Sequence, residues 1–243
     1  MAHFYLNEEI IEAVVGSSAQ LTGSEARHAV TVSRVQVGER VLIGNGAGLT
    51  VSGPIVRAEP GLLEIEVDEV TREPSSPPGI WLAQALAKGD RDELAVQAAT
   101  ELGIDGVIPW MAQRSISRWE GAKVAKGHAR WEAIVREASK QAIRTWIPEV
   151  GELVSTKQLA LLAAHTRMLV LDPTGSEALT ELSPETDRDV VLVVGPEGGI
   201  APAELQMLVA AGAVIVRLGS TVLRTSTAGP AAIAVLNAKL GRW

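Results

Sequence analysis

The sequence predicts an α/β protein in which a small β domain comes before a larger domain built on a mainly parallel sheet. Three observations predict this class. Short alternating runs separated by glycine turns occupy residues 1–72. A segment rich in proline and serine follows at residues 72–79. Beyond it, short apolar runs alternate with amphipathic ones, as strands and helices do in βαβ folds.

The composition indicates a globular protein, because 47% of the 243 residues are hydrophobic and only 21% are charged. No apolar run is long enough to cross a membrane, and Glu8 and Glu9 interrupt any signal-peptide pattern. The chain has no cysteine and four scattered histidines, so we expect no disulfide, no thiolate nucleophile and no metal site. A net charge of −7 argues against a protein that coats nucleic acid through bulk charge. We expect a cytoplasmic protein in which any nucleic-acid site is a local patch.

The first domain is expected to be a β domain that covers residues 1–72. Residues 40–43 and 62–67 alternate between apolar and polar side chains, as half-buried strands do. Glycine turns at residues 44–48 and 59–61 separate such runs. The proline-rich segment that follows cannot hold a helix or a central strand, so we place the domain boundary between residues 72 and 73.

The second domain, residues 73–243, is expected to contain a parallel sheet whose strands are covered on both faces. Short, almost wholly apolar runs predict its strands at residues 80–86, 106–111, 168–171, 190–194 and 213–218. Amphipathic segments predict helices at residues 90–102, 123–146, from about 202 onward, and 231–240.

A glycine-rich turn, Gly195-Pro196-Glu197-Gly198-Gly199, directly follows the apolar strand at residues 190–194. Ligands bind at the carboxyl ends of strands in open α/β sheets, because glycine lets the backbone approach them closely. The lysine of a phosphate loop and the pattern of a dinucleotide fold are both missing, which disfavours those ligands. From glycine content alone, a tight turn that needs a positive φ is an equally good reading.

A second polar loop joins the strand at residues 213–218 to the last helix. Ser226 or Thr227 would cap that helix and Pro230 would suit its first turn. Arg224 has no such structural explanation, and a fixed guanidinium beside the glycine loop would hold an anionic group. A solvated surface arginine is the alternative.

A basic segment lies between Arg118 and Arg144, with seven Lys or Arg residues against three Glu. Arg136, Lys140 and Arg144 follow a spacing of four residues, which places them on one face of the expected helix. A solvated helix face explains this pattern. Together with Arg114 and the loop at residues 88–91, the segment also suits a contact surface for RNA phosphates.

Several of these segments together resemble a known family. The glycine loop, Leu218-Gly219 and the segment 223–228 are similar to the cofactor motifs of the SPOUT methyltransferases. More narrowly, nearly the whole chain resembles the bacterial 16S rRNA uracil-N3 methyltransferases. The further matches are His28 and Arg34, Lys88-Gly89-Asp90-Arg91, residues 100–103, Arg114-Ser115-x-x-Arg118-Trp119 and residues 137–148.

The resemblance implies a PUA-like β-barrel, an RNA-binding domain, in front of a SPOUT α/β domain whose C-terminal part forms a deep trefoil knot. It also implies a homodimer that binds S-adenosyl-L-methionine and needs no metal. The cofactor residues that follow from the motif match are Leu171, Asp172, Pro173, Val194, Gly195, Pro196, Glu197, Gly198, Gly199, Leu218, Gly219, Val222, Leu223, Thr225, Thr227 and Ala228.

The activity that the resemblance implies is methylation of N3 of a specific uridine in the 16S rRNA of the small ribosomal subunit. Uracil N3 is a poor nucleophile while it is protonated, so Arg224 is the expected catalytic residue, favouring the uracil anion. The target base must be unpaired or flipped out for N3 to be reached. The expected RNA contacts are Arg34, Lys88, Arg91, Arg114, Arg118, Arg136, Lys140 and Arg144. Family members often carry a carboxylate at the position of Ser226. Because this chain has a serine there instead, we place no catalytic acid at that position.

Three alternatives stay open from the sequence. Another SPOUT activity, such as ribose 2′-O methylation, would share the cofactor motifs, although the match at residues 137–148 speaks against it. A non-catalytic RNA-binding factor in ribosome assembly would keep the fold without binding the cofactor. A small-molecule α/β enzyme is disfavoured because no acid, base and nucleophile triad is visible.

Overall fold

The computed structural model describes residues 3–183 and 187–243, and they form two compact units. The β unit comprises residues up to Ser75 together with residues 139–147. The α/β unit comprises residues 76–138 and the described residues from Pro148 to Trp243. No helix in the described ranges is long and apolar enough to cross a membrane.

The β unit is a six-stranded sheet in the order β1-β3-β4-β5-β2, in which β6 also pairs with β4. The long strand β4 pairs with β3 and β6 in its first half and with β5 in its second half. One apolar core, including Val41, Ile43, Leu63 and Ile65, is shared by these strands and α1. The elements are β1 (His3–Leu6), β2 (Ser18–Thr22), α1 (Gly23–Arg27), a π-helical turn (His28–Val32), β3 (Arg40–Gly44), β4 (Leu49–Glu59), β5 (Leu62–Glu66) and β6 (Glu69–Arg72). The small β domain predicted from the sequence is thus confirmed.

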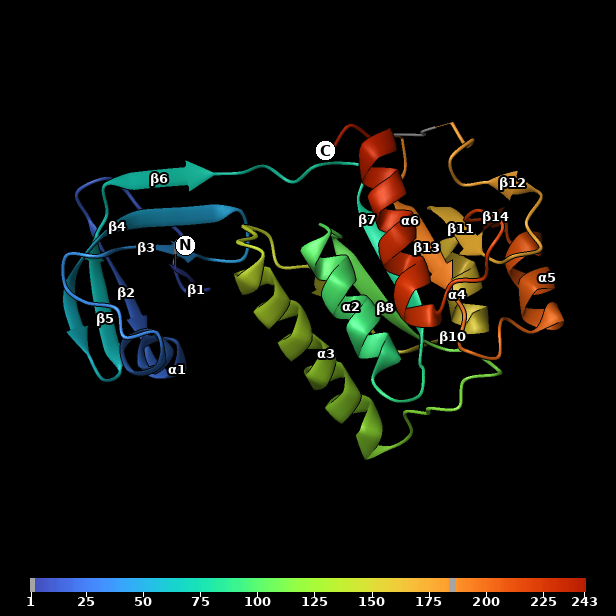
Figure 1. Cartoon of the computed structure of the whole chain (residues 1–243), viewed down its shortest axis with the longest axis horizontal. Helices are drawn as coiled ribbons and strands as arrows, with labels where there is room; N and C mark the ends of the chain where they lie inside the picture. The colour runs from blue at the N-terminus through green and yellow to red at the C-terminus, as the bar shows by residue number, and fades with distance from the viewer. Residues whose placement is uncertain (1–2, 184–186) are drawn as a thin grey trace. The chain divides into compact units, whose positions relative to one another are not determined.

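The α/β unit, on the right of Figure 1, is built on an eight-stranded sheet. Its strand order is β10-β8-β7-β13-β11-β14-β12, and β9 pairs with β8. Every strand pair in it is parallel, which confirms the predicted sheet. Its elements are β7 (Ile80–Ala85), α2 (Arg91–Glu101), β8 (Gly106–Met111), α3 (Ala122–Gln141, whose last three residues belong to the β unit), β9 (Glu149–Val150), β10 (Val154–Ser155), α4 (Thr156–Leu162), β11 (Arg167–Leu171), β12 (Glu177–Ala178), β13 (Val190–Val194), α5 (Pro202–Ala210), β14 (Val214–Arg217) and α6 (Thr225–Lys239).

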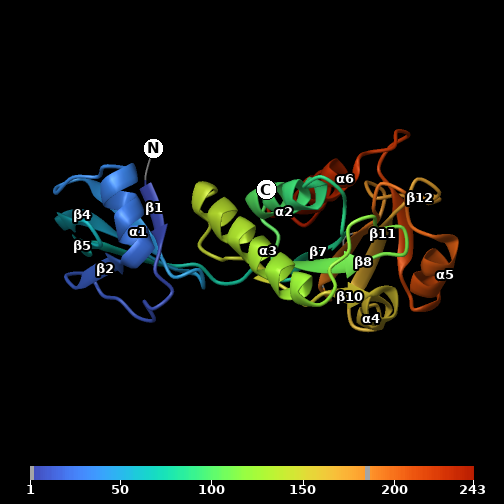
Figure 2. The ribbon, with the colours of Figure 1, turned by 90° about the horizontal axis from the view of Figure 1, so that it is seen from below.

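Helices cover both faces of this sheet, which is why its strands are apolar on both sides. Figure 2 shows α2 and α6 on one side and α4 on the other. The core beneath α4 and α5 contains Trp110, Leu159, Met168 and Val193. All five residues of β13 are buried.

The long helix ends earlier than the sequence predicts. We expected it to run to Trp146, but α3 ends at Gln141, and Ile143 has a φ of 53° that no α-helix tolerates. The next residues instead join the β unit, where the N–H of Gly48 donates to the carbonyl of Thr145 at 3.0 Å. A Cβ on Gly48 would meet the Trp146 ring at 2.7 Å, so residues 142–147 can pack this closely against the turn only because residue 48 is glycine.

The last helix begins earlier than the sequence predicts. We expected it to start at Ala231 with Pro230 in its first turn, but α6 starts at Thr225 and contains Pro230. Ser226 and Thr227 therefore lie inside the helix, and the capping role expected of them is wrong. Gly229 lies so close to β7 that a Cβ there would meet Leu82 at 3.0 Å. Packing against the sheet thus outweighs the backbone hydrogen bond that Pro230 cannot make.

Candidate functional site

Two adjoining hollows lie at the carboxyl ends of the central strands of the α/β unit. Their volumes are about 450 and 510 Å³, and they share six lining residues from the loops after β11 and β14 and from α6. The carboxyl edge of a parallel sheet is where such folds bind ligands, because loops diverge there and leave backbone groups unpaired.

These hollows bring together fifteen of the seventeen residues that the sequence assigned to the cofactor and to catalysis. The lining residues in that set are Leu171, Asp172, Pro173, Val194, Gly195, Pro196, Glu197, Gly199, Leu218, Gly219, Val222, Leu223, Arg224, Thr225 and Ala228. Gly198 and Thr227 line neither hollow. The structure adds Ile200 and Arg91 to the wall of the first hollow.

The glycine loop is a tight turn and also lines the first hollow, so the two interpretations drawn from the sequence are compatible. Gly199 has a φ of 70°, and its N–H donates to the carbonyl of Pro196 at 2.9 Å. A Cβ on Gly195 would lie 2.6 Å from the Ile200 side chain, so only glycine fits there. Gly198 instead meets Arg114, whose guanidinium donates to the Gly198 carbonyl at 2.9 Å. The turn therefore needs its glycines and also forms a wall of the hollow.

A buried hydrogen-bond relay ties the strand ends to the start of α6. Gln84 is fully buried at the end of β7, and its Nε2 donates to Thr225 Oγ1 at 2.8 Å. The Thr225 hydroxyl in turn donates to the Gly195 carbonyl at 2.8 Å. The hydroxyl of Thr225 is thus used within the protein, where it positions the glycine loop. Gln84 is not among the site residues predicted from the sequence, although a lone polar side chain in an apolar strand is a signal for such a role.

Replacing Thr225 by valine is expected to weaken binding of the cofactor that the family resemblance implies, S-adenosylmethionine, about tenfold, since a buried donor and a buried acceptor then lose their partner. Valine keeps the shape of threonine, so packing is preserved. Thr225→Ser keeps the hydroxyl and should bind within about twofold of the wild type. Isothermal titration calorimetry measures both affinities, and equal affinities for all three proteins would contradict the relay.

Glu197 links the glycine loop to the loop at residues 88–91. Its Oε1 accepts from the backbone N–H of Lys88 at 3.0 Å and from the Arg91 guanidinium at 2.8 Å. Partial burial raises the pKa of Glu197, but hydrogen bonds from its own N–H, Arg91 and Lys88 outweigh this and hold the pKa below its ordinary value. Glu197 is therefore ionised at neutral pH.

The other end of the 88–91 loop is held by Asp92, which is 5% exposed. Its carboxylate accepts from the N–H groups of Ala87 at 3.1 Å and Glu93 at 2.9 Å. Burial raises the pKa of Asp92, and these backbone donors oppose the rise. Asp90, inside the loop, has a φ of 58°, a conformation that persists only where surrounding contacts enforce it.

Glu204, in the first turn of α5, is buried and organises the chain behind the glycine loop. Its Oε1 accepts from the N–H of Gln113 at 2.9 Å and from the Thr156 hydroxyl at 2.6 Å, while its Oε2 accepts from the N–H of Ala201 at 3.2 Å. These bonds anchor the residue next to Arg114, which contacts Gly198.

The basic residues assigned to RNA divide between the two units. Lys88, Arg91, Arg114, Arg118 and Arg136 belong to the α/β unit, whereas Arg34, Lys140 and Arg144 belong to the β unit. Arg34 is exposed and has a φ of 55°. Because α3 ends at Gln141, Arg144 does not continue one helix face with Arg136 and Lys140.

Lys140 differs from the expectation of a solvent-facing RNA contact. Its side chain is only 6% exposed, and its Nζ lies 3.0 Å from Glu25 Oε1, which is itself 15% exposed. The helical spacing could not reveal this partner, because Glu25 lies 115 residues earlier in the chain. A buried ammonium that is paired in this way is not displayed to RNA.

Comparisons with known proteins agree with this architecture. Residues 74–237 match the model of an RNA methyltransferase domain, and residues 21–68 match that of an RNA methyltransferase PUA domain. Ribosomal RNA small subunit methyltransferase E of Mycobacterium tuberculosis is 41% identical over 94% of this chain and 89% of its own length. The Bacillus subtilis protein of the same name is 30% identical over 86% of this chain and 85% of its own.

The structure is also similar to solved ones. It matches a crystal structure of ribosomal RNA small subunit methyltransferase E from Neisseria gonorrhoeae bound to S-adenosyl methionine, with a TM-score of 0.87 and 28% identity. That match covers 98% of both chains. A methyltransferase from Legionella pneumophila, solved with the same cofactor bound, also has a TM-score of 0.87 at 29% identity and covers 98% of both chains.

Proposed function

Because this chain belongs to the ribosomal RNA small subunit methyltransferase E family, we propose that it methylates N3 of a uridine in 16S rRNA with S-adenosylmethionine as methyl donor. The observation that supports N3 as the methyl acceptor is an unpaired guanidinium in the wall of the ligand hollow. Arg224 lines that hollow, and its side chain has no hydrogen bond or ion pair to any described residue.

The hollows suit the cofactor in their chemistry. Backbone groups of Gly195, Gly199 and Gly219 line them, and such groups recognise the edges of an adenine. Leu171 and Leu223 supply apolar walls for a flat base. When bound, S-adenosylmethionine supplies a methyl group activated by a sulfonium. We propose that the fourteen cofactor residues of the motif match that line the hollows hold it, while Gly198 and Thr227 support the glycine loop and the start of α6.

Arg224 is proposed to help the acceptor nitrogen lose its proton. Its pocket position at the start of α6 lets the guanidinium lie beside a uracil whose N3 faces the hollow. A fixed cation there stabilises the uracil anion relative to the neutral base, and the anion is the better nucleophile. The relay through Gln84 and Thr225 holds the residue next to Arg224, so the guanidinium starts from a rigid backbone.

We propose that RNA is held by basic side chains of both units: Arg34, Lys88, Arg91, Arg114, Arg118, Arg136 and Arg144. Phosphate contacts of this kind position RNA without reading its sequence. We also propose a homodimer that works in the cytoplasm, where its RNA substrate is made. Sedimentation analysis should give twice the chain mass of 25.6 kDa, and a monomer would contradict the dimer.

The trefoil knot is likewise a proposal. The chain leaves β14, which lies between β11 and β12, and returns to pack α6 against β7 and β13 in the middle of the sheet. A knot additionally requires that this returning segment pass through the loop formed by the preceding chain, and we propose that it does. If the protein is stretched from its ends in a force experiment, the unfolded chain should be shorter than an unknotted chain of the same length.

The decisive experiment is methyl transfer from labelled S-adenosylmethionine to small ribosomal subunits that lack this modification. After digestion to nucleosides, we expect the label in 3-methyluridine. Label in a 2′-O-methylated nucleoside would replace the proposed activity by ribose methylation. Cofactor binding without any transfer would overturn the proposed acceptor, and loss of both would favour a non-catalytic RNA-binding protein.

A further inference from the structure

A third hollow in the α/β unit, here called the Trp119 hollow, is lined by the same 88–91 loop that contributes Arg91 to the ligand site. Its volume is about 340 Å³. Its walls come from that loop, from the first turn of α2, from the segment that precedes α3, and from α3 itself. Its lining residues include Lys88, Asp90, Asp92, Glu93, Trp119, Gly127, Arg130 and Trp131.

Trp119 forms a rigid aromatic wall of this hollow. Its indole lies against Gly127, where a Cβ would meet the ring at 2.3 Å, so the close approach requires glycine. Its ring centroid lies 5.3 Å from that of Trp131, with an interplanar angle of 77°, an edge-to-face contact with a buried partner. Trp119 itself is only partly buried. A fixed and partly exposed indole is a platform on which a flat base stacks with little loss of entropy.

The charges of the wall argue for a base and against a phosphate. Arg130 is already paired with Glu93, whose Oε2 lies 2.8 Å from its guanidinium. Two cations, Lys88 and Arg130, face three carboxylates, those of Asp90, Asp92 and Glu93, so the formal charge of the wall is −1. Asp92 already accepts from backbone N–H groups and Glu93 from Arg130, but the Asp90 side chain has no hydrogen bond or ion pair to a described residue. Its carboxylate can therefore accept from the N–H groups on the edge of a neutral base.

The position of the hollow points to a nucleotide near the methylated base. Arg91 lines the ligand hollow, while Lys88 and Asp90, in the same loop, line the Trp119 hollow. Glu197, in the glycine loop, accepts hydrogen bonds from Lys88 and Arg91 of this loop. These contacts fix the distance between the two hollows. The loop is therefore a shared wall, and a single strand of RNA can extend from one hollow to the other.

We propose that the Trp119 hollow is a subsite for single-stranded RNA, in which the base of a nucleotide that flanks the methylated uridine stacks on Trp119. The assignment rests on the proposed function for the identity of the acceptor, but stacking is measured without catalysis. Flanking bases are unstacked when a target base is turned out, and an indole replaces the stacking partner that they lose.

The test compares Trp119→Ala, Trp119→Leu and Trp119→Phe in the full-length protein. Fluorescence anisotropy gives the Kd for a labelled single-stranded RNA that spans the methylated uridine. We expect Trp119→Ala and Trp119→Leu to weaken binding about 5- to 100-fold, since stacking on an aromatic side chain is lost. Trp119→Phe keeps a ring and should bind within about threefold of the wild type. Leucine keeps an apolar cover over Gly127 should alanine destabilise the chain.

Abasic RNAs locate the stacked base. One abasic position beside the target should weaken binding to the wild type by the same factor but leave binding to Trp119→Leu unchanged. Trp243→Ala is the matched control, because that indole is 67% exposed and is not part of the hollow. Equal Kd values for wild type and Trp119→Leu, or the same abasic penalty in both, would overturn the subsite. If methyl transfer fails in the wild type, a random single-stranded RNA gives the same comparison, so the two proposals fail separately.

Discussion

Replacing Arg224 by alanine is expected to lower the rate of methyl transfer about 100- to 1,000-fold while changing the Kd for S-adenosylmethionine by less than about threefold. The guanidinium is exposed in the wall of the hollow and has no described partner, so its loss removes no internal contact. The effect falls on the rate because the negative charge on uracil develops only as the proton leaves. Single-turnover assays and calorimetry measure the two quantities.

The matched variants separate charge from shape. Arg224→Lys keeps a cation and should recover part of the rate, whereas Arg224→Gln should not. The deficit of Arg224→Ala should also shrink as the pH rises, because uracil N3 then loses its proton to solvent without help from the protein. An equal loss of cofactor binding and turnover, or a deficit that is independent of pH, would assign Arg224 to cofactor binding instead.

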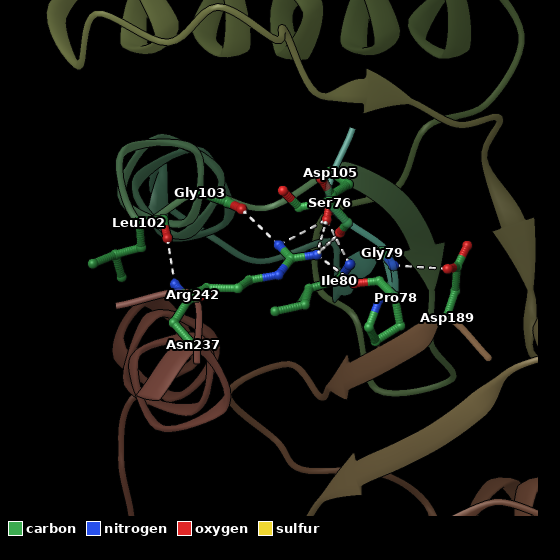
Figure 3. A network of polar contacts seen from close by, with 10 residues as sticks. All are labelled: Ser76, Pro78, Gly79, Ile80, Leu102, Gly103, Asp105, Asp189, Asn237 and Arg242. Atoms are coloured by element: carbon green, nitrogen blue, oxygen red, sulfur yellow. Dashed lines mark hydrogen bonds and ion pairs between the residues drawn. The ribbon is translucent and has the colours of Figure 1, made fainter. Parts of the chain in front are cut away.

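Arg242→Ala is expected to lower the free energy of unfolding by about 2–3 kcal/mol, because the guanidinium holds three segments together. It donates to Asp105 Oδ2 at 3.0 Å and to the carbonyls of Ser76 at 2.6 Å and of Pro78 (Figure 3). The Arg242 side chain is only 14% exposed. Without it, the segment that enters β7 loses its partner, and the Asp105 carboxylate loses its cation.

For a domain of this size, such a loss corresponds to a fall in Tm of about 5–10 °C, which calorimetry or circular dichroism measures. The control is Arg57→Ala, which breaks an ion pair with Glu59 whose side chains are both about half exposed and should leave Tm unchanged. Neighbouring contacts in Figure 3, from Asn237 to the Leu102 carbonyl and from the Gly79 N–H to Asp189, remain in the variant. A Tm equal to that of the wild type would show that those contacts suffice.

The short apolar runs in the sequence predicted the strands of the parallel sheet accurately. The run at residues 190–194 is the strand β13 to the residue, and the other predicted strands differ from β7, β8, β11 and β14 by at most one residue at an end. Strands that are covered on both faces must be apolar throughout, so the pattern carries the signal directly. The motif match likewise named most residues of the ligand hollows before any contact was known.

Helix ends and side-chain partners depended on distant parts of the chain. Three misjudged features, the ends of α3 and α6 and the exposure of Lys140, are each decided by a contact far away in sequence: Thr145 with Gly48, Gly229 with Leu82, and Lys140 with Glu25. Local propensity is worth only fractions of a kcal/mol per residue, and such packing overrides it.

The sequence by itself determined the fold class, the family and the loops that line the two hollows, because these follow from local periodicity and from motifs whose residues are close in the chain. Only the tertiary structure decided which residues support those loops. Gln84 reaches Thr225 across 141 positions, and Glu197 reaches Lys88 across 109. A hydrogen bond is satisfied by whatever group lies within about 3 Å, and nearness in space is set by how the strands are ordered in the sheet, which no local pattern records.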